Sequence, residues 1–261
     1  MIPDILKKIV DARVERLKIE KKQRDVFDII NSCCNSNPPS FLNAIRKKGL
    51  SVIAELKRAS PTTGLIRHQF EPIQTALQYE QAADAISVLT EQDYFLGSPA
   101  YLEKAAKAVS LPILRKDFII DEYQVFEAKA LGASCVLLIA SILDREKLAA
   151  FIQISHGIGL DTLVEIHDEN ELEDAVVSGV RLIGINNRNL HTFSVDISTT
   201  ARLSRLVPDD ILVVSESGIR TEKDIQLLKN ARIDGILVGE CLMRSSCPAE
   251  KILELKRTYE R

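Results

Sequence analysis

The stretch VIAELKRASP, residues 52–61, is an apolar run that ends in charged and polar side chains. It reaches Glu55, Lys57 and Ser60 with no turn residue in between. Burying an ionised group costs several kcal/mol even after the surroundings relax. A strand of this kind is therefore better explained as part of a site than as a packing element.

Similar runs recur along the rest of the chain, each followed by a segment of helical periodicity. Strands are predicted near 51–56, 85–90, 112–116, 135–140, 161–166, 181–186, 211–216 and 235–239. Helices are predicted near 72–83, 98–109, 121–131, 144–157, 168–178, 196–206, 221–230 and 248–259. Parallel neighbours need crossover connections, so regular alternation implies a parallel sheet. One helix per strand in eight units predicts a closed (β/α)8 TIM barrel.

The first 48 residues precede the first predicted strand. Ile5, Leu6, Ile9 and Val14 recur at helical spacing among charged residues, which predicts an amphipathic helix. The segment is shorter than most domains that fold alone. We therefore expect a single barrel domain over 1–261, with residues 1–48 as a helical extension packed on it.

Composition limits the functional classes. A chain with 46% hydrophobic and 27% charged residues and a net charge of -3 is typical of a soluble globular protein and argues against nucleic-acid binding. No apolar stretch reaches the about 18 residues of a membrane span, and the N-terminus lacks a secretory signal. Five Cys without a CxxC pair and four scattered His do not predict a metal site.

We expect a cytoplasmic protein without a membrane partner. The sequence does not determine its oligomeric state, and a monomer is favoured.

Polar residues follow five of the predicted strands, at the end where the active sites of such barrels lie. For one strand, helix caps and solvated loop charges would explain them, but five coincident strands favour a site. Side chains alternate along a strand, so residues two apart share a face. The polar ends are Glu55 with Lys57, Arg115 to Asp117, Glu165 with His167, Asn186 to Arg188, and Ser215 to Gly218.

Lys116 and Glu165 form a natural acid and base pair. Partial desolvation or nearby cations would lower the pKa of Lys116, and an apolar barrel mouth would raise the pKa of Glu165. His167 is a weaker candidate because it precedes Asp168, which is expected to open a helix. A position at the rim or at the helix N-terminus fits His167 equally well.

Two late loops suggest a phosphate ligand. SESGI (215–219) and VGECLM (238–243) each carry a glycine ahead of a predicted helix. Glycine lets backbone N–H groups approach an anion, and the helix dipole favours negative charge there.

The long loop 58–71 is interpreted as a lid, with a passive surface loop as the alternative. Phe118 could stack on an aromatic ligand or belong to the core.

The motifs together resemble the indole-3-glycerol phosphate synthase family over almost the whole chain. They are IAELKRASP (53–61), ISVLTEQDYFLGS (86–98), LPILRKDFIIDEYQ (111–124), LLIA (137–140), LVEIHDENEL (163–172), IGINNRNL (183–190), VSESGI (214–219) and LVGECLMR (237–244). The resemblance implies ring closure, decarboxylation and dehydration of 1-(2-carboxyphenylamino)-1-deoxyribulose 5-phosphate, a small phosphorylated molecule, in tryptophan biosynthesis. It implies no cofactor and no metal.

The resemblance also implies roles for individual residues. Lys116 would be the general acid in ring closure, and Glu165 would handle the later proton transfer. Lys57 would anchor an anionic end of the substrate, with Glu55 and Asn186 orienting the reacting centre. Further contacts with the substrate would come from Ser60, Phe118, Leu137, Arg188, Glu216 and Ser217, and contacts with its phosphate from Lys57, Gly218, Gly239 and Glu240.

One motif departs from the family pattern. The family usually carries a Lys before the first-loop glycine (SP-S-K-G), where this chain has Thr62-Thr63-Gly64. We expect altered lid dynamics or phosphate steering rather than lost activity. The length also leaves no room for a second fused barrel, which predicts a monofunctional enzyme.

Two rival interpretations remain. One is another phosphate-binding barrel, such as phosphoribosylanthranilate isomerase or the tryptophan synthase α subunit. The other is a catalytically silent scaffold. Neither requires Lys57, Lys116 and Glu165 together.

Overall fold

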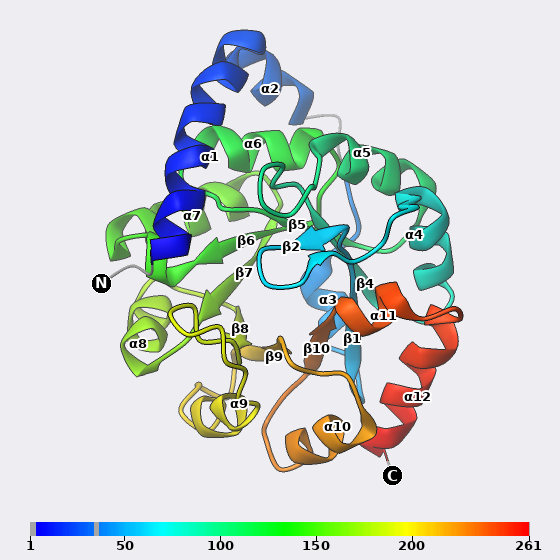
Figure 1. Ribbon diagram of the computed structural model, residues 1–261. Helices are drawn as coiled ribbons and strands as arrows, with labels where there is room; N and C mark the ends of the chain where they lie inside the picture. Colours follow the sequence, from blue (N-terminus) through cyan, green and yellow to red (C-terminus); the bar gives the residue numbers. More distant parts are fainter. Residues whose placement is uncertain (1–3, 34–36, 261) are drawn as a thin grey trace.

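The computed structural model describes residues 4–33 and 37–260, so residues 1–3 and 34–36 of the expected extension and Arg261 lie outside the described part. Eight parallel strands in this part close into a barrel in the order β1-β10-β9-β8-β7-β6-β5-β4 (Figure 1). Their bounds are β1 (Ser51–Leu56), β4 (Ala85–Leu89), β5 (Ile113–Lys116), β6 (Cys135–Ile139), β7 (Asp161–Ile166), β8 (Leu182–Asn186), β9 (Leu212–Glu216) and β10 (Gly235–Val238). The predicted (β/α)8 TIM barrel is confirmed.

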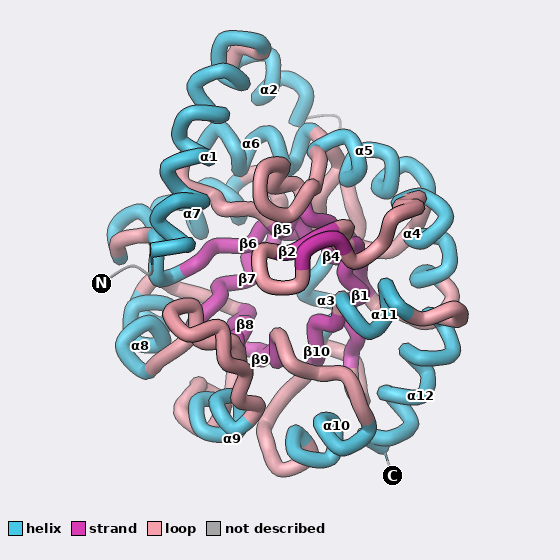
Figure 2. The backbone as a smooth tube through the Cα atoms, viewed as in Figure 1, coloured by secondary structure: helices cyan, strands magenta, loops and turns pink. Residues whose placement is uncertain are grey.

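Helices surround the strands on the outside (Figure 2). They are α4 (Pro72–Glu80), α5 (Pro99–Ala108), α6 (Glu122–Ala130), α7 (Arg145–Gly157), α8 (Glu169–Val177), α9 (Ser198–Leu203), α10 (Glu222–Leu228) and α12 (Pro248–Glu260). Side-chain oxygens accept hydrogen bonds from the first-turn backbone at several helix starts, including those of Asp121, Asp144 and Asp168. Such N-caps explain why these helices begin where they do.

The structure adds short elements that the sequence pattern did not predict. A hairpin of β2 (Ala59–Ser60) and β3 (Gly64–Leu65) follows β1. The 3-10 helix η1 (Ala140–Ile142) follows β6, and α11 (Glu240–Arg244) follows β10. The prediction of exactly one helix per strand is therefore wrong after β6 and β10, since segments of three to five residues are too short to show a period.

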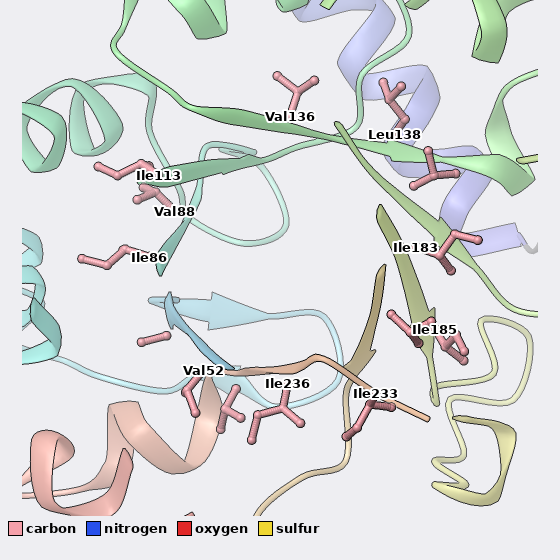
Figure 3. Packing of buried hydrophobic residues seen from close by; sticks show 14 of the residues in the cluster. Val52, Ile86, Val88, Ile113, Val136, Leu138, Ile183, Ile185, Ile233 and Ile236 are labelled. Atoms are coloured by element: carbon pink, nitrogen blue, oxygen red, sulfur yellow. The ribbon is translucent and has the colours of Figure 1, made fainter. Parts of the chain in front are cut away.

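The strands are buried on both faces. Outward-facing residues such as Val52, Val136 and Ile183 pack against the helices, as Figure 3 shows. Inward-facing residues, including Leu114 and Leu163, fill the barrel itself. Burial on both faces explains why the strands read as continuous apolar runs.

A short helix, α3 (Phe41–Ile45), closes the N-terminal end of the barrel. Its Phe41, Leu42 and Ile45 side chains are buried in the same cluster as the barrel interior. The Leu42 backbone N–H donates to the Asp161 carboxylate (2.9 Å), which ties α3 to the start of β7. The opposite end, at the carboxyl ends of the strands, is the end that can admit a ligand.

The first two helices pack on the outside of the barrel. Helices α1 (Asp4–Gln23) and α2 (Val26–Cys33) bury Leu17 and Ile29 against Tyr123 of α6. The Tyr123 hydroxyl also donates to the backbone carbonyls of Glu20 and Arg24, each at 3.2 Å. Helices α1 and α2 thus pack on α6 and α3 packs on the barrel end, while the single-domain division over 1–261 stays a prediction.

The plug at the N-terminal end predicts a stability effect. Phe41 is fully buried, so Phe41→Ala should lower the free energy of unfolding by about 3–5 kcal/mol through lost burial and a cavity. Phe27→Ala is the matched control because Phe27 is 72% exposed. Urea unfolding of both variants measures the difference, and equal midpoints would contradict the role given to α3.

Candidate active site

A cavity opens at the carboxyl ends of the strands, opposite α3. All of the site residues predicted from the sequence line it: Glu55, Lys57, Ser60, Lys116, Phe118, Leu137, Glu165, Asn186, Arg188, Glu216, Ser217, Gly218, Gly239 and Glu240. Their convergence follows from strand closure, because the inward-facing side chains at the ends of parallel strands meet at one rim.

Lys116 lies at the centre of the charged groups. Its Nζ donates to Glu165 Oε2 and to Glu216 Oε2, both at 2.9 Å. The two carboxylates are buried and the Lys116 side chain is 14% exposed. These residues stand on β5, β7 and β9, and Glu55 stands on β1, so the four come from alternate strands of the barrel. Alternate strands supply each layer of side chains in such barrels. Glu216, predicted only as a substrate contact, therefore belongs to the central charge cluster.

The pKa directions differ from those predicted. Burial opposes the charge on Lys116, but the charges of Glu165 and Glu216 outweigh it and raise its pKa. Burial likewise opposes ionisation of Glu165, but the Lys116 and His167 charges outweigh it and lower its pKa to about 2. The predictions of a lowered Lys116 pKa and a raised Glu165 pKa are wrong, because the nearest neighbours are opposite charges at hydrogen-bond distance.

Glu216 titrates in the opposite direction from Glu165. Its burial raises its pKa to about 7, and the charge of Glu165 adds to this effect while Lys116 opposes it. Its Oε1 atom is buried without a hydrogen-bond partner. The site thus holds one carboxylate that stays ionised and one that can take up a proton near neutral pH.

Two glycines make room for these carboxylates. A Cβ atom on Gly184 would lie 2.0 Å from Glu216 Oε1, and one on Gly239 would lie 2.3 Å from Glu55 Oε2. Glu55 in turn pairs with Lys57 Nζ at 2.5 Å. A larger residue at either position would therefore displace the neighbouring carboxylate from the place it now occupies.

Asn186 and Arg188 extend the site from β8. Asn186 Nδ2 donates to Glu165 Oε1 (3.0 Å), and Asn186 Oδ1 accepts from the Arg188 backbone N–H (3.0 Å). Arg188 Nη1 donates to the Phe193 carbonyl (3.1 Å), and burial together with the charge of Arg220 lowers the pKa of Arg188. A guanidinium held in this way can receive an anion. Asn187 instead bonds Ser215 and lies outside the cavity lining.

The late loops are only partly as predicted. Gly239 directly precedes α11, but Gly218 does not open a helix, since α10 begins at Glu222 after its N-cap Thr221. Gly218 has a φ of +85°, a backbone conformation that favours glycine. The same loop brings Arg220 to the cavity, where it pairs with Glu240 at 3.6 Å.

Several lining residues were missed in the sequence. Ile5, Leu6 and Ile9 of α1 line the cavity, so the apolar face of that helix serves the site as well as packing. Phe95 lies with its ring centre 6.1 Å from that of Phe118. The apolar spacing of α1 was visible, but spacing alone does not say which surface a helix covers.

The β2–β3 hairpin, cyan in Figure 1, lies over the open end of the barrel. Ser60, Thr62 and Thr63 from this hairpin line the cavity, and Ser60 Oγ accepts from the Thr63 backbone N–H (3.2 Å). The movement of this segment as a lid stays a prediction.

The described residues lack two further kinds of feature, a metal-binding cluster and a membrane-spanning helix. Within 4–33 and 37–260, no group of His, Cys, Asp and Glu could hold a metal ion. No helix in the same part of the chain is long and apolar enough to cross a membrane.

A barrel mouth with an ammonium between two carboxylates, beside arginines and glycine loops, defines a (β/α)8-barrel enzyme site suited to acid–base chemistry on an anionic small molecule. The family model of indole-3-glycerol phosphate synthase matches residues 6–255. The chain belongs to the indole-3-glycerol phosphate synthase family.

Individual relatives carry the same family description. The chain is 48% identical to an indole-3-glycerol phosphate synthase of Ruminiclostridium cellulolyticum over 98% of this chain and 99% of the relative. It is 46% identical to one of Endomicrobium trichonymphae over 97% and 99%. Among solved structures, 3-keto-L-gulonate-6-phosphate decarboxylase of Vibrio cholerae matches with a TM-score of 0.62 at 15% identity, covering 82% of this chain and 99% of that one. That last likeness concerns the fold alone.

The central ion pairs predict a measurable pKa change. Lys116→Met removes the charge that keeps Glu165 ionised, so the pKa of Glu165 should rise from about 2 to its ordinary value or above, since burial then opposes ionisation. Carboxyl ¹³C NMR titration measures the shift, and circular dichroism checks that the variant folds. Lys147→Met, at an exposed position of α7, is the control and should leave Glu165 unchanged.

Proposed function

We propose that this chain is an indole-3-glycerol phosphate synthase that converts 1-(2-carboxyphenylamino)-1-deoxyribulose 5-phosphate to indole-3-glycerol phosphate, carbon dioxide and water. By its chemistry it is a carboxy-lyase. The observation that carries the proposal is the contact of Lys116 Nζ with both Glu165 and Glu216 at the barrel mouth. It supplies a proton donor and a carboxylate base side by side, as the reaction needs.

Ring closure begins with Lys116. The aromatic carbon that bears the carboxylate attacks the ribulosyl carbonyl, and negative charge develops on the carbonyl oxygen. The Lys116 ammonium neutralises this charge by donating its proton, a step that contributes about 10²- to 10⁴-fold in rate. Its raised pKa keeps Lys116 in the acid form at neutral pH, ready to donate.

Loss of carbon dioxide and of water completes the reaction. The carboxylate leaves as carbon dioxide, and the former carbonyl oxygen leaves as water after it takes a second proton. A base removes one proton from the methylene carbon, and we assign this step to Glu165. Its lowered pKa supports the role because the side chain stays ionised at rest.

Residues that line the cavity can bind both charged ends of the substrate. We assign Lys57 and Arg188 to the substrate anions and the loops around Gly218 and Gly239 to the phosphate, with Arg220 beside them. Glu55 holds Lys57, and Asn186 holds the Glu165 carboxylate. The aromatic ring would lie against apolar lining residues, namely Phe118, Leu137, Phe95 and the α1 side chains.

We further propose that the chain has this one activity, because the family match accounts for residues 6–255 and the described residues form one barrel. The cytoplasmic location, the monomeric state, independence from a cofactor and the effect of Thr62 and Thr63 stay predictions.

The proposal predicts an activity that needs no additive. Purified protein in a chelating buffer should convert the carboxyphenylamino-deoxyribulose phosphate to a product with indole fluorescence. Mass spectrometry should show the loss of carbon dioxide and water. Verified substrate that remains unchanged would refute the function.

Lys116→Met should lower kcat at least about 100-fold, since it removes the general acid. KM should change far less, because the anion-binding residues remain. Steady-state fluorescence assays measure both constants, with Lys147→Met as the control. Wild-type turnover in Lys116→Met would remove Lys116 from its assigned role.

A further inference from the structure

The proposed reaction consumes one proton in every turnover. The substrate carboxylate is negatively charged but leaves as neutral carbon dioxide. A proton must therefore balance the negative charge that stays behind. In detail, two protons go to the oxygen that leaves as water, and one returns from the methylene carbon. One proton must therefore enter the site from solvent for each product formed.

The two carboxylate oxygens of Glu165 have different partners. Its Oε2 accepts from Lys116 Nζ, while its Oε1 lies 3.5 Å from His167 Nε2 and accepts from Asn186. His167 is held on its other side, because its Nδ1 lies 3.0 Å from Glu171 Oε2. A carboxylate accepts hydrogen bonds, so this contact fits a hydrogen on Nδ1, and the 3.5 Å distance places Nε2 toward Glu165.

A second cavity reaches the outer side of His167. This outer polar cavity lies between the loops that follow β7 and β8, and His167 lines it but does not line the substrate cavity. The His167 Nε2 atom is buried without a hydrogen-bond partner. His167 therefore stands between Glu165 and a polar space, with its free nitrogen on the Glu165 side.

We propose that His167 is the positioning residue through which the consumed proton reaches Glu165 and then Lys116. This proposal rests on the function proposed above. The imidazolium gives its Nε2 proton to Glu165 Oε1, and the N–H electron pair stays on the ring as the neutral Nδ1–H tautomer bonded to Glu171. The carboxyl group turns and passes the proton to the lone pair of the Lys116 amine. The imidazole ring then turns so that Nε2 reaches the outer polar cavity, takes a proton there from water or buffer acid, and returns to face Glu165.

The charges around His167 support the imidazolium form. Burial opposes it, but the hydrogen bond to Glu171 and the charges of Glu165, Glu171 and Glu216 raise the pKa of His167 above its ordinary value. The outer polar cavity also holds other titratable or charged groups, namely Asp168, Arg188, His191, Asp196 and Arg202. His167 therefore carries the proton for transfer below its raised pKa and loses it as the pH rises through that pKa.

The activity test compares two histidines of the same cavity. His167→Asn should lower kcat about 100-fold with little change in KM, because proton transfer and not binding is impaired. Added imidazole should restore turnover in proportion to its concentration, which a merely structural role would not produce. His191→Asn is the control, since His191 is exposed and lines the same cavity. Unchanged kcat in His167→Asn, or impaired kcat that imidazole does not restore, would overturn the proposal.

The titration test does not depend on turnover. In ¹⁵N NMR of the wild-type protein, His167 should titrate above 6.5, and Glu165→Gln and Glu171→Gln should each lower its pKa. If the pKa of His167 is the same in Glu165→Gln as in the wild-type protein, the relay is overturned. A wild-type protein that makes no indole product would refute the proposed function instead, so the two failures are distinguishable.

Discussion

The site depends on the Lys116 ammonium held between the carboxylates of Glu165 and Glu216. Each of these charges alone would be costly at this depth, and together they compensate each other's desolvation. The three residues stand on β5, β7 and β9, so the cluster forms only when the barrel has closed. Barrel closure and the assembly of the chemistry are thus the same structural event.

The rest of the barrel keeps this cluster at one end. Helix α3 closes the other end with Phe41 and Ile45, and apolar side chains fill the interior above it. Gly184 and Gly239 lack the side chains that would displace Glu216 and Glu55. Water and ligand can therefore approach from the carboxyl ends of the strands, where hairpin β2–β3 and α1 line the opening.

Strand order and most of the site were predictable because they depend on local patterns. Charges at the ends of apolar runs placed Lys57, Lys116 and Glu165 on one rim, and the structure brings them to one cavity. The pKa directions were not predictable, because they depend on distances of a few ångströms between residues 49 and 100 positions apart. Arg220 and the α1 contacts were missed for a similar reason, since nothing local marks which cavity they reach.

By itself, the sequence determined the alternation of strands and helices, the face that each strand turns inward, and the polar residues at the strand ends. These follow from periodicities of 2 and 3.6 residues and from the cost of burying charge. Only the tertiary structure decided which charges became partners. It paired Lys116 with two carboxylates, gave Glu165 and Glu216 opposite pKa shifts, and set His167 beside Glu165. Electrostatic effects depend on distance and burial in space, and neither is written in the order of residues along the chain.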